Sequence, residues 1–203
     1  MEKYYSFGDK GSYSEMASKK LFPDKEIILL PSFQEIYDKV IEDKNSVGIL
    51  PFYNTTTGLV PSFKELFNAE FNDGTLELKD DLSTLVDIYY LDITFDLIHL
   101  KKYENEMNIE KIFSNPVAYK QCTNYILNNF PNIDISKDYL IKGKEFNFCN
   151  PKAVNELFNH INNNYASISP SHLSDEAKFD IIERNINDQK DNKTYFAAFL
   201  GKS

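Results

Sequence analysis

Residues 26–67 read EIILLPSFQEIYDKVIEDKNSVGILPFYNTTTGLVPSFKELF and switch repeatedly between two hydrophobic periods. A short apolar run, Glu26–Leu30, predicts a strand, and Val47–Pro51 predicts another. Between them Ser32 begins a capping box, which is followed by apolar side chains at helical spacing, namely Phe33, Ile36, Tyr37, Val40 and Ile41. After a polar turn, Pro61–Phe67 predicts a further helix, so the stretch forms a strand–helix–strand–helix unit.

The same alternation extends to both sides of this stretch. Lys3–Phe7 predicts a first strand, and a helix is expected from about residue 14 to 22. Further on, Thr84–Leu100 is rich in β-formers but too long for one ordinary strand, which predicts one long bent crossing strand or two successive strands. Strands that alternate with helices imply βαβ units and a largely parallel sheet, and therefore the α/β class.

The second half of the chain repeats these signals. A helix is predicted from Ser114-Asn115-Pro116 to about residue 129, and another from Asn150-Pro151 to about residue 162. Strands are predicted at Tyr165–Ile168, Phe179–Ile186 and Thr194–Leu200. Two α/β halves joined by two crossings predict two lobes, residues 1–80 with 169–203 and residues 81–168, which hold a ligand between them.

The composition restricts the function. The chain has 203 residues, of which 42% are hydrophobic and 26% charged, as in packed globular proteins. Its formal net charge of -9 argues against nucleic acid or an anionic membrane as the main partner, although a few local donors are enough to bind a small anion. The N-terminus has no apolar signal region and no run approaches a membrane span, so we expect a cytoplasmic protein.

Cysteine and histidine are sparse and scattered. Cys122 and Cys149 lack CxxC spacing and are expected to be free thiols in a reducing compartment. The histidines, His99, His160 and His172, share no metal-ligand spacing, so we predict structural or surface roles for them and no metal.

Polar turns in front of helices are the predicted ligand sites, because ligands of open α/β sheets bind at the carboxyl ends of strands. Ser12 and Ser14 lie where a helix begins, and its N–H groups and dipole favour a carboxylate; the alternative is that a serine there is an N-cap. Asn54 and Thr55 belong to a run of small polar side chains that offers an amide and several hydroxyls. The pair Ser114 and Asn115 opens another helix in a commonplace way.

In this order along the chain, the turns resemble the motifs of the prephenate dehydratase family, and the resemblance covers nearly the whole chain. The corresponding stretches are Gly11-Ser12-Tyr13-Ser14, Pro51 to Val60, Ser114-Asn115-Pro116 with Gln121-Cys122, and Asn192 to Phe196. The resemblance implies a two-lobed, periplasmic-binding-protein-like fold of type II, with the ligand cleft between the lobes. It also implies a homodimer or a higher oligomer, and a lyase that acts on prephenate without a cofactor.

The resemblance further implies the chemistry. Family dehydratases remove the ring carboxylate of prephenate as CO2 and its ring hydroxyl as water, which gives phenylpyruvate. The threonine that corresponds to Thr194 assists the leaving hydroxyl, and the arginine that follows it in the family engages a carboxylate. Hydroxide is a poor leaving group unless it gains a proton or a hydrogen bond as the C–O bond breaks, which agrees with this role.

The sequence departs from the family inside the motifs. Tyr53 stands for the family's glutamate, Thr55 for its serine, Asn115 for its histidine and Tyr195 for its arginine, whereas Asn54, Gly58, Ser14, Ser114, Thr194 and Phe196 keep the family's residue types. Only a guanidinium offers a rigid bidentate fork to a carboxylate, and the chain's single arginine, Arg184, is expected to be a surface or structural residue. Because Ser203 lies seven residues after Phe196, the sensory ACT domain of many dehydratases is expected to be absent.

Three hypotheses follow. The departures favour a decarboxylase that removes CO2 from prephenate but keeps the hydroxyl, as in secondary metabolite biosynthesis, with phenols of Tyr53 and Tyr195 as new proton donors. The retained Thr194 favours a dehydratase of aromatic amino acid biosynthesis, and the third hypothesis is a non-catalytic binder of an aromatic or keto acid. The predicted catalytic residues are therefore Thr194, Tyr53 and Tyr195. The predicted substrate-binding residues are Ser12, Ser14, Asn54, Thr55, Ser114, Asn115 and Phe196.

Overall fold

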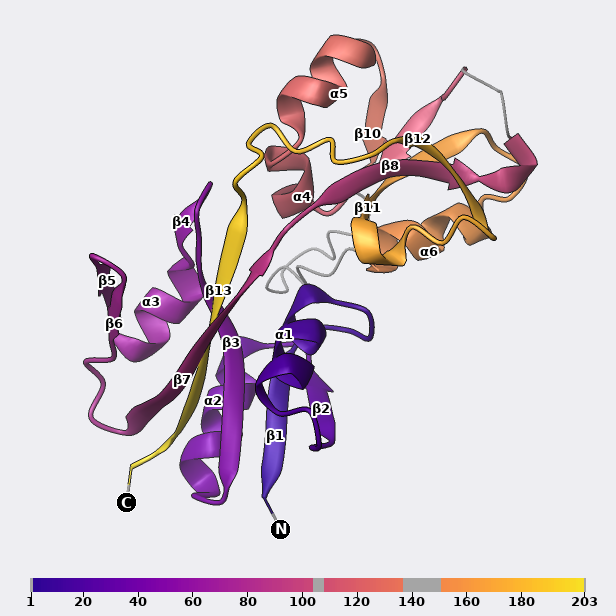
Figure 1. Cartoon of the computed structure of the whole chain (residues 1–203). Coiled ribbons are helices and arrows are strands. Elements are labelled where there is room, and N and C mark those ends of the chain that lie inside the picture. Colours follow the sequence, from indigo (N-terminus) through magenta and orange to yellow (C-terminus); the bar gives the residue numbers. More distant parts are fainter. Residues whose placement is uncertain (1, 104–107, 137–150, 203) are drawn as a thin grey trace. The chain divides into compact units, whose positions relative to one another are not determined.

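A computed structural model describes residues 2–103, 108–136 and 151–202 (Figure 1). The chain divides into two compact units, and each is built around its own mixed sheet. Unit 1 comprises Met1–Asp92 and Asp191–Ser203, and unit 2 comprises Ile93–Lys190. No helix in the described ranges is long and apolar enough to cross a membrane.

Both unit boundaries lie later in the chain than the predicted ones, which were residues 80/81 and 168/169. The strand β7 (Ser83–Asp92) pairs with β13 (Lys193–Gly201) along its whole length, so the chain leaves unit 1 only after Asp92. The strand β12 (Phe179–Glu183) pairs with β8 (Phe95–Leu100) and therefore belongs to unit 2. The long β-rich stretch thus forms two successive strands, β7 and β8, with a break at Ile93–Thr94.

Unit 1 contains a sheet with the strand order β2-β1-β3-β13-β7, to which β4 adds beside β3. The pairs β1·β2 and β1·β3 are parallel, whereas β13 runs antiparallel to both of its neighbours. Its remaining elements are β1 (Lys3–Phe7), α1 (Tyr13–Leu21), β2 (Ile27–Leu30), α2 (Phe33–Glu42), β3 (Ser46–Asn54), β4 (Gly58–Leu59), α3 (Pro61–Phe67), β5 (Glu70–Asn72) and β6 (Thr75–Glu77).

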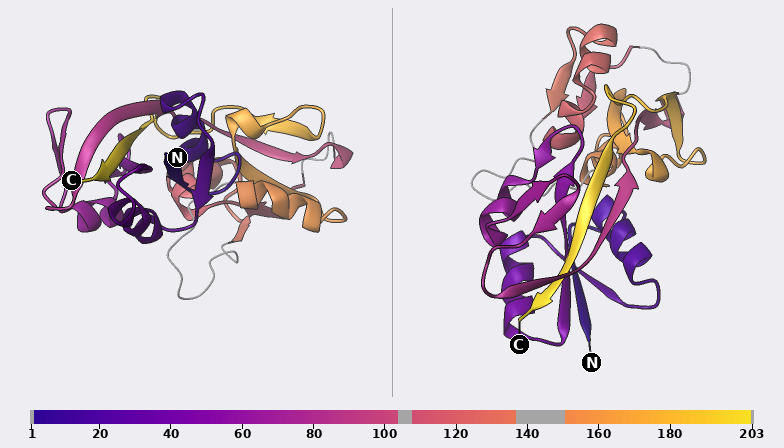
Figure 2. Two further views of the ribbon diagram at one scale, coloured as in Figure 1. Left: turned by 90° about the horizontal axis from the view of Figure 1, so that it is seen from below. Right: turned by 60° about the vertical axis from the view of Figure 1, so that its left-hand side comes forward.

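Helices cover both faces of this sheet (Figure 2). The helix α2 begins as predicted, because the Ser32 hydroxyl accepts the Glu35 N–H at 3.0 Å. Side chains of a strand alternate between its two faces. Along β13, Ala197 and Phe199 accordingly pack with α2 and α3, whereas Phe196 and Ala198 pack with α1. The side of the sheet to which each β13 residue points is therefore fixed by the two cores.

Unit 2 has the strand order β10-β9-β11-β8-β12, with two parallel pairs followed by two antiparallel pairs. Its other elements are η1 (Lys101–Tyr103), β9 (Lys111–Phe113), α4 (Pro116–Lys120), α5 (Thr123–Asn129), β10 (Asp134–Ser136), α6 (Pro151–Asn159), β11 (Tyr165–Pro170) and η2 (Ser171–Leu173). The single helix predicted to residue 129 is thus split into α4 and α5. The split is stabilised by the Asp188 carboxylate, which accepts the N–H groups of Asn124 and Tyr125 at the start of α5.

Candidate functional site

Two of the family motifs meet in unit 1, at the end of β3 and the start of β13. Asn54 and Thr194 are paired residues of the two antiparallel strands. The Asn54 side chain is 5% exposed, and its Nδ2 donates to Thr194 Oγ1 at 3.0 Å, to Asn192 Oδ1 at 2.8 Å and to the Lys193 carbonyl at 3.1 Å. An amide nitrogen carries two hydrogens, so one of these hydrogens is shared.

The threonine-rich turn folds back onto the same amide. Asn54 Oδ1 accepts the N–H of Thr56 at 2.9 Å, the Thr56 hydroxyl at 2.5 Å and the N–H of Thr57 at 3.2 Å. An asparagine side chain that accepts backbone N–H groups of the following residues is typical of a tight turn. The turn therefore holds the Asn54 amide, and the amide in turn holds Thr194.

Thr55 fastens this turn to the other strand. Its N–H donates to the Lys193 carbonyl at 2.9 Å, and its hydroxyl accepts the Lys193 N–H at 2.9 Å and donates to the Asp191 carbonyl at 3.1 Å. The hydroxyl proton of this predicted substrate-binding residue is thus engaged by the main chain. The neighbouring Lys193 ammonium forms ion pairs with Asp191 and Asp92.

Tyr53 and Tyr195 are also direct cross-strand partners, and their ring centroids lie 5.8 Å apart. Both rings are half-buried and pack against the core on the α2 and α3 side, where Phe71 and Tyr90 add further ring contacts. Neighbouring strand residues point to opposite faces, so the two phenol rings lie on the face opposite to Asn54 and Thr194. The positions of the family's glutamate and arginine are therefore adjacent here, and an aromatic pair occupies both.

At the start of α1, Ser12 is an N-cap whose hydroxyl accepts the Glu15 N–H at 3.2 Å. Glu15 Oε2 in turn accepts the Gly11 N–H at 2.6 Å. Although burial opposes ionisation, hydrogen bonds from Lys19 and Gly11 hold the pKa of Glu15 below its ordinary value. A carboxylate of the chain itself thus already uses donors of this turn. Ser14 is buried in the first turn of α1, and its carbonyl accepts the Ser18 hydroxyl at 2.8 Å.

The other predicted substrate-binding residues belong to other elements of the two units. Ser114 and Asn115 belong to unit 2 and are each 1% exposed. Asn115 is the N-cap of α4 and accepts the Val117 N–H at 2.8 Å, while the Ser114 hydroxyl donates to the Asn115 carbonyl at 2.9 Å. Phe196 is 1% exposed and packs in the core of unit 1 with Tyr4. Its side chain is thus part of the packing that fixes β13.

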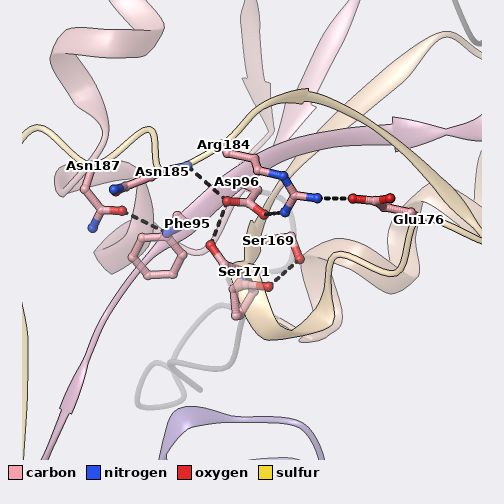
Figure 3. A network of polar contacts seen from close by, with 9 residues as sticks. Phe95, Asp96, Ser169, Ser171, Glu176, Arg184, Asn185 and Asn187 are labelled. Carbon is pink, nitrogen blue, oxygen red and sulfur yellow. Dashed lines mark hydrogen bonds and ion pairs between the residues drawn. The ribbon is translucent and has the colours of Figure 1, made fainter. Parts of the chain in front are cut away.

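A second polar network, which the sequence did not reveal, is centred on Asp96 of unit 2 (Figure 3). The Asp96 carboxylate is buried and accepts the Ser171 hydroxyl at 2.6 Å and the Asn185 N–H at 3.0 Å. Arg184 Nη1 lies 3.4 Å from Asp96 Oδ2, and the same guanidinium also forms an ion pair with the Glu176 carboxylate. The chain's only arginine is therefore engaged by two carboxylates of its own unit.

Two further titratable side chains, Cys122 and His99, are buried. Cys122 is fully buried, and burial raises the pKa of its thiol, which disfavours the reactive thiolate; Cys149 lies outside the described residues. His99 is buried against Asp180, with its Nε2 2.8 Å from a carboxylate oxygen. Within the described ranges, no group of three or more histidine, cysteine, aspartate and glutamate side chains is arranged to bind a metal.

A hollow of about 460 Å³ lies in unit 2 along β12. Lys101, Glu176 and Arg184 are among the residues that line it, and it includes none of the predicted site residues. Both cations of its lining are already engaged by Glu176, because Lys101 donates to the Glu176 main-chain carbonyl and Arg184 pairs with the Glu176 carboxylate. The Asn54–Thr194 cluster is therefore the better candidate for chemistry.

The comparison with protein families agrees with the motifs. Residues 5–202 match the family described as prephenate dehydratase. The chain therefore belongs to the prephenate dehydratase family.

Two relatives are themselves prephenate dehydratases. That of Lactococcus lactis subsp. lactis (strain IL1403) is 25% identical over 197 residues, which cover 96% of this chain and 62% of the relative. That of Methanocaldococcus jannaschii is 28% identical over 197 residues, which cover 95% of this chain and 62% of the relative. The chain thus spans less than two thirds of the length of either relative.

Solved structures share the fold. The prephenate dehydratase of Staphylococcus aureus subsp. aureus Mu50 superposes with a TM-score of 0.69 at 22% identity, covering 100% of this chain and 67% of that one. The prephenate dehydratase of Arthrobacter aurescens in complex with L-Phe gives a TM-score of 0.73 at 14% identity, covering 100% and 61%. GqqA, described as a quorum quenching acylase, gives 0.66 at 16% identity, covering 100% and 65%. Because proteins with different activities share it, the fold alone does not fix the reaction.

Proposed function

We propose that this chain is a lyase that acts on prephenate and that Thr194 assists departure of the ring hydroxyl, which makes the reaction a dehydration. One observation supports this most directly: Asn54 Nδ2 donates to Thr194 Oγ1 at 3.0 Å. Thr194 accepts this hydrogen bond, so its own proton is available to a neighbouring oxygen. Thr194 is also partly exposed, as contact with a substrate requires.

The proposed reaction balances without a cofactor. The bond between the ring and its carboxylate breaks to release CO2, and its electron pair moves through the diene. The C–O bond opposite then breaks, and the hydroxide leaves as water: the Thr194 hydroxyl gives it a proton and regains one from solvent. The ring becomes aromatic, which supplies the driving force, and the products are phenylpyruvate, CO2 and water. A hydrogen bond that strengthens as the oxygen gains charge lowers the barrier.

Decarboxylation without loss of the hydroxyl is the second candidate, and tyrosines at positions 53 and 195 favour it because they replace the family's charged pair. Their half-buried rings, however, pack against the apolar core on the face opposite to Thr194. Phenols in that position are poorly placed to share a substrate with Thr194. Dehydration is therefore the better supported reaction, although the sequence alone favours decarboxylation.

The test is to incubate the full chain with prephenate at neutral pH and to follow products by absorbance and mass spectrometry. Phenylpyruvate, formed faster than in a control without protein, supports dehydration. A product that has lost CO2 only and remains non-aromatic overturns dehydration in favour of decarboxylation. Unchanged prephenate that raises the melting temperature of the protein overturns both and indicates a binding protein.

A further inference from the structure

We infer that Asn54 and Thr56 act as positioning residues that set the direction in which the Thr194 proton points; this inference rests on the proposed function. The starting point is the orientation of the Asn54 amide. Its Oδ1 accepts the N–H groups of Thr56 and Thr57 at 2.9 and 3.2 Å. A backbone N–H only donates, so the atom that it contacts is the amide oxygen, and the atom 3.0 Å from Thr194 Oγ1 is the amide nitrogen.

Reversing the orientation of the Asn54 amide would cost several hydrogen bonds. In the present orientation Nδ2 donates to Asn192 Oδ1 at 2.8 Å and to the Lys193 carbonyl at 3.1 Å. If the amide were turned over, its oxygen would face these two acceptors, and its NH2 group would face the two N–H donors of the turn. Asn54 and Asn192 are 5% and 2% exposed, so water cannot replace the lost partners freely. The Thr194 oxygen is therefore held as an acceptor, and its O–H points away from Asn54.

Thr56 strengthens this arrangement. Its hydroxyl lies 2.5 Å from Asn54 Oδ1, whereas the exposed Thr57 hydroxyl lies at 3.4 Å. Donors on the oxygen of an amide polarise it and make its N–H a stronger donor, and hydrogen bonds in such a chain reinforce one another. The series of hydrogen bonds from Thr56 through Asn54 to Thr194 thus makes the Thr194 hydroxyl a stronger donor to a leaving oxygen than it would be without Thr56.

Asn54→Asp is the most informative variant, because the carboxylate keeps the size of the side chain and still accepts the N–H groups of the turn. It removes the donor to Thr194 and offers an acceptor that captures the Thr194 proton. We expect kcat for prephenate to fall by about 100-fold or more, with KM within about threefold of wild type. Activity should recover in part as pH falls and the introduced carboxyl becomes protonated, after subtraction of the uncatalysed rate at each pH. A wild-type pH profile with only a uniform loss overturns the inference.

Thr56→Val tests the second step, with Thr57→Val as its matched control. Loss of the close hydroxyl should lower kcat by about threefold to tenfold and leave KM near wild type, and Thr56→Ser should restore it. Thr57→Val should lower kcat by less than Thr56→Val. Equal losses in the two valine variants, or no rescue by serine, overturn the role of Thr56.

A measurement without substrate separates this inference from the proposed function. In NMR spectra of the free protein, the Asn54 side-chain NH2 protons should exchange slowly with water and shift on Thr194→Val and on Thr56→Val. If prephenate is not turned over but these shifts are seen, the proposed reaction fails and the orientation stands. If the NH2 protons exchange freely or do not respond, the inference fails whatever the substrate.

Discussion

The two units contain buried polar centres that resemble each other in construction and differ in outcome. Asn54 of unit 1 and Asp96 of unit 2 each join a strand end to a segment far away in the sequence. Asn54 both donates and accepts, and it leaves the proton of a neighbouring hydroxyl uncommitted. The Asp96 carboxylate can only accept, so Ser171, Asn185 and Arg184 all direct their hydrogens inward to it.

This difference indicates which polar centre is suited to a catalytic role and which to a stabilising one. A buried carboxylate needs several donors to offset its lost hydration, and here it also holds the only arginine of the chain. A buried neutral amide needs fewer partners and is able to orient a neighbour without adding charge. We therefore expect changes around Asn54 to affect rate and changes around Asp96 to affect stability.

The largest expected effect is on the rate of Thr194→Val. The substitution keeps the shape of the side chain and removes the hydroxyl, so dehydration of prephenate should fall by about 100-fold to 10,000-fold. The melting temperature should change by only a few degrees, because Asn54 Nδ2 keeps its bonds to Asn192 and Lys193. Initial rates of phenylpyruvate formation and a thermal melt check both parts. Retained activity would show that the hydroxyl of Thr194 does not assist the reaction.

Asp96→Ala should show the opposite profile. Removal of the carboxylate leaves the Ser171 hydroxyl and the Asn185 N–H without their acceptor, and the cost is about 2–4 kcal/mol of unfolding free energy. Glu176→Ala is the matched control, because Glu176 pairs with Arg184 in an exposed position and should contribute less than about 1 kcal/mol. Chemical denaturation of both variants measures the difference. Equal losses would contradict the assignment of Asp96 as the centre of the network.

The tyrosine pair distinguishes the two reactions with a smaller effect. Tyr53→Phe and Tyr195→Phe each keep the ring packing and remove only the phenolic hydroxyl. We therefore expect a free energy of unfolding within about 1 kcal/mol of wild type and an unchanged product. The decarboxylase hypothesis instead predicts that one of these variants loses its activity.

A double-mutant cycle with Tyr53→Glu and Tyr195→Arg extends this test. Each single change places a charge in an apolar cluster, whereas the double variant sets opposite charges in cross-strand contact. We expect the double variant to be more stable than the sum of the singles by about 1 kcal/mol. Tighter binding of prephenate by the single Tyr195→Arg variant would show instead that position 195 faces the ligand.

The sequence predicts best what local interactions decide. The strands and helices of residues 26–67 follow from their periodicity, and Ser32 is the N-cap of α2, as its place in the predicted capping box requires. The hydrogen bond between Asn54 and Thr194 joins residues 140 positions apart, and it depends on the register of β3 against β13. That register also makes Tyr53 and Tyr195 neighbours, which no local pattern indicates. The split between α4 and α5 was missed for the same reason, because Asp188 stabilises it from elsewhere in the chain.

The smallest expected effect tests whether Thr55 supports the turn or contacts the substrate. Thr55→Val removes the hydroxyl that links the Lys193 N–H to the Asp191 carbonyl, while the Thr55 N–H still donates to the Lys193 carbonyl. Because these main-chain groups lie near the surface, water replaces part of the loss, and we expect about 1 kcal/mol of destabilisation. Thr55→Ser keeps the hydroxyl and should remain near wild type in a denaturant titration. A support role predicts that kcat and KM follow stability in both variants, whereas a rise in KM for Thr55→Val at full stability would assign the hydroxyl to the substrate.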